Sequence, residues 1–232
     1  MTSSDIKSIK SHFWIAAAPF FSSTILVASG SSGVAGETIE AQCELFDVDG
    51  TPIQRFQVEF PSREVGIIEV EPFMAGLKMQ SGIIQGHLAV QSRAGTTHLC
   101  RQQVGDRADI LTAPRGLKSR EMSFMPLLLG GRREHLVVVV STGPEDAQVV
   151  IRLLYGSRSP EWTVQIPGNG CRIVSLEHEL LATFDDSSWH KGVMQGYLRI
   201  SPRSQSAVVC QMVERLPGET EEHQSYRSVS SW

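Results

Sequence analysis

The sequence has few residues spaced to hold a metal ion. The seven histidines form no HxH or HExxH pattern, and no two cysteines form a CxxC or other close pair. Structural zinc sites are built from closely spaced ligands, so we expect no metal and no cofactor. Well-separated thiols favour a reducing compartment, although two disulfides stay possible if the chain is secreted. The four cysteines are Cys43, Cys100, Cys171 and Cys210.

The chain also lacks a strong net charge and a nucleophile motif. The formal net charge is −4 over 232 residues. This balance gives no overall attraction to nucleic acid or to an anionic membrane surface, so we expect neither partner. No GxSxG sequence is present, and such a turn is what exposes the catalytic serine of many hydrolases. The sequence therefore predicts a protein that is not an enzyme.

A long apolar run is missing as well. Residues 13–28 are the nearest to one, but Pro19 and the polar stretch 22–24 interrupt them, so they are too broken to span a membrane. Lysines before this run and small residues after it resemble a signal peptide. We expect a cytoplasmic protein, with a secreted or periplasmic location as the alternative if residues 13–29 act as a signal.

The sequence does contain an internal repeat. Residues 81–90, SGIIQGHLAV, recur as residues 191–200, KGVMQGYLRI. Between residues 81–100 and 191–210, six positions are identical without a gap. Chance would give about one or two, so the pattern indicates tandem duplication of one unit.

Short alternating segments separated by turn residues surround both copies. Residues 56–60 alternate apolar and polar side chains, and the preceding Asp49-Gly50 is typical of a tight hairpin. Regularly spaced short strands predict an all-β fold of two tandem β-sandwich units with about seven strands each. The expected organisation is a flexible N-terminus (1–12), unit one (13–104), a linker (105–120), unit two (121–215) and a flexible acidic tail (216–232).

Three features of the chain resemble a known family. They are an aromatic-small opening at residues 13–17, a first strand that runs into Ala28-Ser29, and a hairpin followed by a strand that ends in proline at 58–61 and 164–167. This order is similar to the sensory rhodopsin transducer family of small bacterial β-sandwich proteins. The resemblance implies a soluble oligomeric adaptor without known catalysis, here as a fused pair of units. The duplication and the glutamate-rich tail depart from that family.

Strand phasing divides the repeated stretch into two faces. Because side chains alternate along a strand, Leu88 and Leu198 should point into the core with the glycines and aliphatic residues two positions away. The opposite, polar face is then the candidate for contact with a partner or with the other unit. Its amides have a structural alternative, which is to satisfy backbone groups at a sheet edge or bulge. The candidate interface residues are Gln85, His87, Gln195, Tyr197 and Arg199.

These observations favour a non-catalytic protein-interaction or assembly module. Exposed strand edges would promote self-association or binding of a protein partner. A carbohydrate- or small-ligand-binding sandwich that uses Trp14, Trp189 or Tyr197 is the alternative, so a glycan partner stays possible. A less favoured hypothesis is an enzyme with its site in the connection 178–190, where acidic residues and histidines cluster.

Overall fold

A computed structural model describes residues 8–18, 21–29, 37–77, 79–80, 83–104, 107–130, 133–184, 192–216 and 225–230. The predicted all-β class is confirmed, because strands form four antiparallel sheets. The chain divides into two compact units. The first comprises residues 1–47 and 51–113, and the second comprises residues 48–50 and 114–232.

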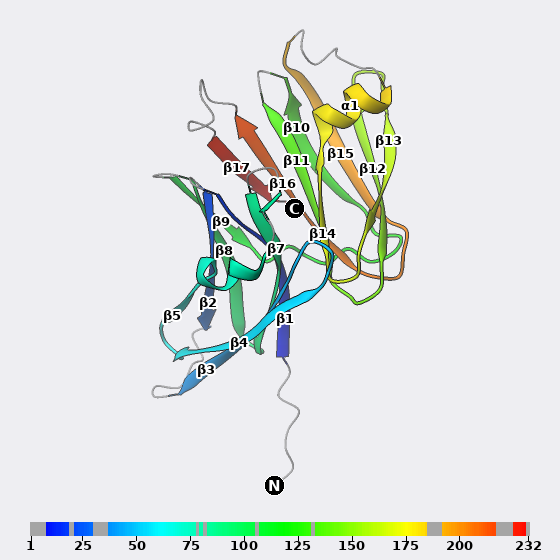
Figure 1. Ribbon diagram of the computed structural model, residues 1–232. Coiled ribbons are helices and arrows are strands. Elements are labelled where there is room, and N and C mark those ends of the chain that lie inside the picture. Colours follow the sequence, from blue (N-terminus) through cyan, green and yellow to red (C-terminus); the bar gives the residue numbers. More distant parts are fainter. Residues whose placement is uncertain are drawn as a thin grey trace. The chain divides into compact units, whose positions relative to one another are not determined.

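The first unit contains two of the sheets (Figure 1). One has the strand order β1-β7-β3-β4, with β6 beside β7, and the other has the order β5-β2-β8-β9. The elements are β1 (Ser8–Ala17), β2 (Phe21–Ser29), β3 (Thr38–Phe46), β4 (Pro52–Pro61), β5 (Val65–Glu69), a 3-10 helix η1 (Glu71–Gly76), β6 (Met79–Gln80), β7 (Ile83–Arg93), β8 (Thr96–Val104) and β9 (Arg107–Thr112).

The second unit contains the other two sheets, with strand orders β10-β15-β12-β13 and β14-β11-β16-β17. Its helix α1 follows β14 directly and packs against β14 and β11 (Figure 1). The elements are β10 (Ser123–Leu129), β11 (Glu134–Ser141), β12 (Ala147–Tyr155), β13 (Glu161–Ile166), β14 (Cys171–Ser175), α1 (Leu176–Phe184), β15 (Met194–Pro202), β16 (Val208–Leu216) and β17 (Ser225–Ser230).

Each unit has a hydrophobic core to which both of its sheets contribute. In the first core Leu88 of β7 is fully buried in a cluster that includes Ile25 and Cys100 of the other sheet. In the second core Leu198 of β15 is fully buried in a cluster that includes Val139. The inward phasing predicted for the two leucines is therefore confirmed. Burying one such side chain contributes roughly 2 kcal/mol, and this drives the sheets together.

The predicted hairpin at residues 47–50 joins β3 to β4. The backbone N–H of Asp47 donates to the carbonyl of Thr51, and the Thr51 N–H donates to Oδ1 of Asp47, at 3.0 and 2.8 Å. Gly50 has φ +82°, a conformation that costs a residue with a Cβ atom more than it costs glycine. The Asp-Gly pair thus supplies both the side-chain acceptor and the left-handed residue of this turn.

The ends of the predicted units differ from the structure in three places. Strand β1 begins at Ser8, within the segment 1–12 that we expected to be flexible. Strand β9 lies within the expected linker 105–120 and pairs with β8. Strand β17 lies within the expected tail 216–232 and pairs with β16. All three strands lie at the edge of a sheet, where one side needs no partner and a mixed polar sequence is tolerated.

The apolar stretch 13–29 that resembles a signal peptide forms parts of β1 and β2. It supplies core residues to the first unit, among them Phe13, Ile15, Ile25 and Val27. In the described part of the chain, no helix combines the length and apolar character needed to cross a membrane.

Candidate functional site

The outer face of the repeated stretch differs in exposure between the two units. In β15 the burial alternates, so that Leu198 and Ile200 are buried while Gln195 and Tyr197 are exposed. In β7 the residues on both faces are buried, including Gln85 and His87. The predicted polar face of β7 exists, but within the chain it is not at the surface.

Gln85 has a buried hydrogen-bond partner. Its Oε1 accepts from the indole Nε1–H of Trp14 at 2.9 Å, and the Trp14 ring packs at a tilt on Phe21. A buried indole N–H needs such an acceptor, because leaving it unpaired costs about 1–3 kcal/mol. This arrangement agrees with the structural alternative for Gln85, although the group that it satisfies is an indole rather than the backbone. It also makes Trp14 a buried residue rather than an exposed ligand platform.

His87 belongs to a buried aromatic group. Its Nε2 lies 2.9 Å from Nδ1 of His12, and its ring stacks on Phe46 with the centroids 5.2 Å apart. Burial, followed by the charges of His87 and Lys10, lowers the pKa of His12 to about 3. His12 is therefore neutral near pH 7.

The outer surface of β15 continues onto the edge strand β10. Pro126 lies opposite Tyr197 in the strand register, and Leu128 lies opposite Gln195. Phe124 and Leu128 are 50% and 43% exposed, and Tyr197 is 48% exposed. Arg199, across from Phe124, is held by an ion pair with Glu161 at 3.7 Å. We call this surface the β10–β15 face, comprising Phe124, Pro126, Leu128, Gln195, Tyr197 and Arg199.

Three of the five predicted interface residues thus lie on one exposed surface. Sequence reasoning missed the neighbours of these residues on β10. The sequence SFMPLLL of that strand places large apolar side chains on both faces, so the polar alternation that marks an outer face is absent. The structure shows strict burial alternation in β10 instead.

The second unit also contains a buried charge cluster at the start of β11. Nδ1 of His135 lies 2.6 Å from Oε1 of Glu177, and the His135 backbone N–H donates to Oε2 of the same carboxylate at 2.8 Å. Nε2 lies 3.7 Å from Oε1 of Glu214, a distance suited to an ion pair but not to a hydrogen bond. Arg133 lies 3.4 Å from the other oxygen of Glu214.

The two carboxylates set the charge of His135. Burial works to lower the pKa of this imidazole, but hydrogen bonding and the negative charges of Glu177 and Glu214 outweigh it and raise the pKa to about 9. The His135 imidazolium therefore joins α1, which carries Glu177, to strands β11 and β16. This arrangement is suited to holding the helix in place, because each charge has an internal partner.

A second histidine network lies in the first unit. The imidazole ring of His98 is buried, and so are the two serines that it contacts. Nε2 of His98 lies 2.7 Å from Oγ of Ser92, and Nδ1 of His98 lies 2.9 Å from Oγ of Ser11. Burial lowers the pKa of His98. Both ring nitrogens contact hydroxyl groups, and neither of these contacts is to a carboxylate, so the network lacks the acid that orients a catalytic histidine.

The connection expected to hold an enzyme site is divided in the structure. Glu177 points to His135, whereas His178 is exposed and its backbone N–H donates to Oγ of Ser175 at 3.3 Å. Residues 185–191, including Trp189 and His190, lie outside the described residues. Within the described ranges, no three His, Cys, Asp or Glu side chains are grouped to hold a metal ion.

The four cysteines are free and buried. Burial raises the pKa of Cys43, Cys100 and Cys210 to about 12, so these thiols are unreactive near pH 7. Cys100 and Cys210 belong to the two hydrophobic cores, where they pack as small apolar residues.

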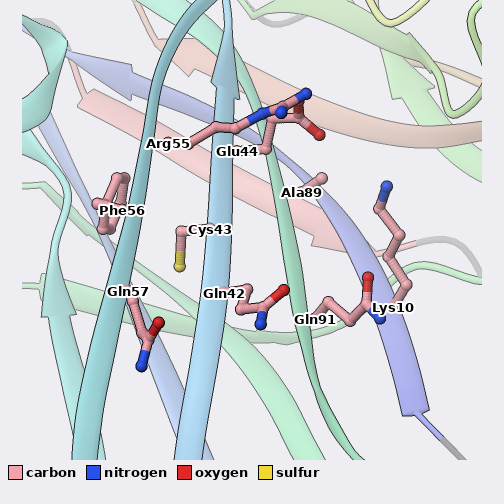
Figure 2. A pocket seen from close by; sticks show the side chains of 9 residues that line it. All are labelled: Lys10, Gln42, Cys43, Glu44, Arg55, Phe56, Gln57, Ala89 and Gln91. Carbon is pink, nitrogen blue, oxygen red and sulfur yellow. The ribbon is translucent and has the colours of Figure 1, made fainter.

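The outer surface of the sheet β1-β7-β3-β4 has a hollow of about 510 Å³. It runs across four strands, and Figure 2 shows the ion pair of Arg55 and Glu44 at one end. Lys10 and Gln91 also line the hollow, and they lie opposite each other in the register of β1 and β7 (Figure 2). The ring of Phe56 stacks on Phe73. The lining combines polar and apolar surface. The lining residues are Lys10, Gln42, Cys43, Glu44, Arg55, Phe56, Gln57, Ala89 and Gln91.

Comparison with protein-family models finds no matching family, and comparison with curated proteins finds no match. The resemblance to the sensory rhodopsin transducer family therefore stays a prediction.

Proposed function

We propose that this protein is a non-catalytic interaction or assembly module built from two β-sandwich units that arose by duplication, and that it binds a protein partner through the β10–β15 face. The observation that carries the proposal is the group of exposed apolar side chains on that face, Phe124, Leu128 and Tyr197. Exposed apolar surface of this kind is typical of protein interaction sites.

The strand orders support the duplication. The order β1-β7-β3-β4 corresponds strand by strand to β10-β15-β12-β13, and β5-β2-β8-β9 corresponds to β14-β11-β16-β17. The registers agree as well, because Ile25 pairs with Cys100 as Val139 pairs with Cys210. Helix α1 occupies the position of η1 in the element order. Equivalent cores are thus built around the residues that the two sequence copies share.

The composition of the β10–β15 face supports a protein partner. Aromatic residues and arginine are enriched at protein interfaces, and Phe124, Tyr197 and Arg199 lie next to one another on β10 and β15. The ion pair with Glu161 restrains Arg199 before a partner binds, which reduces the entropy that is lost on association. Pro126 lies in the edge strand β10, where its lack of an N–H disfavours addition of another strand. The face, rather than the edge, is therefore the expected contact.

The mass in solution tests this proposal. Size-exclusion chromatography with light scattering should give a mass above the 25.5 kDa of one chain, rising with concentration. Leu128→Asp should lower the association, because it places a charge in the apolar face while the fold is kept. Leu181→Asp, at an exposed apolar position on α1, which packs against β11 and β14, is the matched control and should associate normally. A wild-type protein that is a strict monomer at every concentration would count against self-assembly.

The hollow on the sheet β1-β7-β3-β4 favours a second candidate function, binding of a small polyhydroxylated ligand such as a glycan. Its lining offers amide, ammonium and carboxylate groups over an area suited to a small molecule. Gln42→Ala combined with Gln91→Ala should then abolish binding on a glycan array. An array without any wild-type signal would remove this candidate.

A further inference from the structure

One continuous row of polar side chains crosses the hollow on the sheet β1-β7-β3-β4. In the strand register Lys10 lies opposite Gln91, which lies opposite Gln42. Gln42 in turn lies opposite Gln57, and all four residues line the hollow (Figure 2). Neighbouring strands lie about 4.8 Å apart, so the row extends over about 14 Å. We call it the polar row, comprising Lys10, Gln91, Gln42 and Gln57.

The hollow is built from the first unit alone. Its nine lining residues lie on β1, β3, β4 and β7, within the ranges 1–47 and 51–113 that make up this unit. A second row runs beside the polar row, in which Ala89 lies opposite Glu44 and Glu44 lies opposite Arg55. The side chain of Ala89 is a single methyl group among longer side chains, which leaves space above the middle of the sheet.

The glutamines of the polar row offer carbonyl oxygens to a ligand. Nε2 of Gln42 donates to Oε1 of Glu40 at 2.8 Å. Nε2 of Gln57 donates to Oε1 of Glu59 at 3.1 Å. An ionised carboxylate only accepts hydrogen bonds, so these contacts fix which end of each amide is the NH2 group. Within the described part of the chain, Oε1 of neither glutamine has a donor, so both oxygens are left for hydroxyl groups of a ligand.

Lys10 supplies the available positive charge. Its side chain is exposed, and among the described residues no acidic side chain pairs with it. Arg55, the other cation of the lining, is already paired with Glu44. Beyond the opposite end of the polar row, Glu40 and Glu59 lie opposite each other and would repel an anion. The anionic group of a ligand therefore has one favourable position, which is beside Lys10.

We infer that the hollow binds an acidic oligosaccharide, with a carboxylate against Lys10 and ring hydroxyl groups against Gln42 and Gln57. This inference rests on the second candidate function proposed above, and it adds the charge, the orientation and the minimum length of the ligand. A single pyranose ring is shorter than the polar row, so a ligand that contacts both ends has at least two sugar rings. The hydrogen bond between ammonium and carboxylate is charge-assisted, so it should decide between acidic and neutral sugars.

Simpler ligands would use only part of the polar row. An inorganic anion would contact Lys10 and leave the amide oxygens without donors. A neutral sugar would satisfy the amides and leave the ammonium group without an anion. A ligand that carries both hydroxyl groups and a carboxylate matches the whole row.

Isothermal titration calorimetry of the full chain with paired acidic and neutral sugars tests the inference. The probes are trisaccharides of galacturonic, glucuronic and mannuronic acid, each also as its methyl ester, which keeps the hydroxyl groups and removes the charge. We expect at least one acid to bind about tenfold or more tightly than its ester. Lys10→Gln should lower the affinity for the acid to that for the ester, and it should leave the affinity for the ester unchanged. Gln42→Ala combined with Gln57→Ala should weaken the binding of both.

Two controls separate a specific site from general charge effects. Lys118→Gln removes an exposed ammonium group in the second unit and should bind the acid as the wild type does. Triglutamate has carboxylates without hydroxyl groups and should bind at least about tenfold more weakly than the acid. Lys10, Gln42 and Gln57 are exposed, so the unfolding midpoint of each variant should equal that of the wild type.

The other outcomes overturn the inference in distinguishable ways. If the esters bind as tightly as the acids, or if Lys10→Gln leaves the affinity for the acid unchanged, the assigned charge is wrong but the glycan-binding function stands. If triglutamate binds as tightly as the acids, the hydroxyl contacts are wrong. If no acid binds while the glycan array shows a neutral ligand, the inference fails and the function stands. If no sugar of either kind binds to the wild type, both fail.

Discussion

Strands β7 and β15 carry the same Gln-Gly stretch and occupy equivalent positions in their sheets, yet they differ in what their outer faces contact. On the core side they agree, because Leu88 and Leu198 are both fully buried. On the outer side His87 is fully buried, whereas Tyr197 is 48% exposed. The core thus restricts one face of the strand in both units, while the opposite face differs between them.

This difference indicates where to look for function in a chain with two equivalent strands. A residue shared by both copies, such as Gly86 with Gly196, serves the fold that the copies have in common. A Cβ atom at Gly86 would come within 2.5 Å of the carbonyl of Phe46, so glycine is needed there for close strand packing. Specific binding is more readily assigned to positions where the copies differ and one of them is exposed, as at His87 and Tyr197.

The largest expected effect falls on the face that the two strands share. Leu88→Asp and Leu198→Asp each place an unpaired charge in a core, and each should destabilise its own unit by more than about 4 kcal/mol. Urea denaturation followed by circular dichroism would measure the loss. Tyr197→Asp, on the outer face of the same strand as Leu198, is the control and should unfold near the wild-type midpoint. Stability unchanged in both leucine variants would show that the assignment of faces is wrong.

The units should also respond to pH in opposite directions. His135 in the second unit has its pKa raised from 6.5 to about 9, so its contribution to stability is complete below pH 6.5 and is lost as the pH rises through 9. His12 in the first unit has its pKa lowered to about 3, so its contribution is complete above pH 6.5 and is lost as the pH falls toward 3.

Denaturation of matched variants across this pH range would check the sign of both effects. The difference in unfolding free energy between wild type and His135→Gln should shrink from pH 6.5 to 9. The difference between wild type and His12→Gln should shrink from pH 6.5 downward. The same pH slope for both variants would contradict the opposite protonation states of the two histidines.

A third comparison replaces the equivalent outer residues themselves. His87→Ala removes a buried ring that contacts His12 and Phe46, and it should cost roughly 2–3 kcal/mol. Tyr197→Ala removes an exposed ring and should stay within about 0.5 kcal/mol of wild type, while weakening association. Thermal unfolding and light scattering on the two variants would separate the roles. Equal stability losses would show that the outer face of β15 is buried in the same way as that of β7.

The smallest expected difference concerns the two shared glutamines. Gln85→Ala leaves the buried indole N–H of Trp14 without its acceptor and should cost about 1–3 kcal/mol. Gln195→Ala changes an exposed side chain and should cost less than about 0.5 kcal/mol. Gln85→Glu, which keeps an acceptor, is the informative partner variant. A near-zero cost for Gln85→Ala would show that the Trp14 contact contributes little to stability.

The all-β class and the inward leucines could be predicted from the sequence because each rests on a local period of side chains. The three edge strands could not, since β9 and β17 form through pairing with β8 and β16 rather than through their own pattern. The cluster around His135 was also missed. Glu177 directly precedes the connection 178–190, but its partner His135 is 42 positions away in the chain and meets it only after β11 and α1 pack together.

The exposure of Tyr197 in solution tests the central claim most directly. Hydroxyl-radical footprinting across a protein concentration series would compare it with Tyr155, which is buried in the core of the same unit. The account predicts that oxidation of Tyr197 and Phe124 falls as the concentration rises, while that of Tyr155 stays low throughout. Oxidation of Tyr197 that remains high and constant while the protein visibly associates would contradict the claim that the β10–β15 face is the interface.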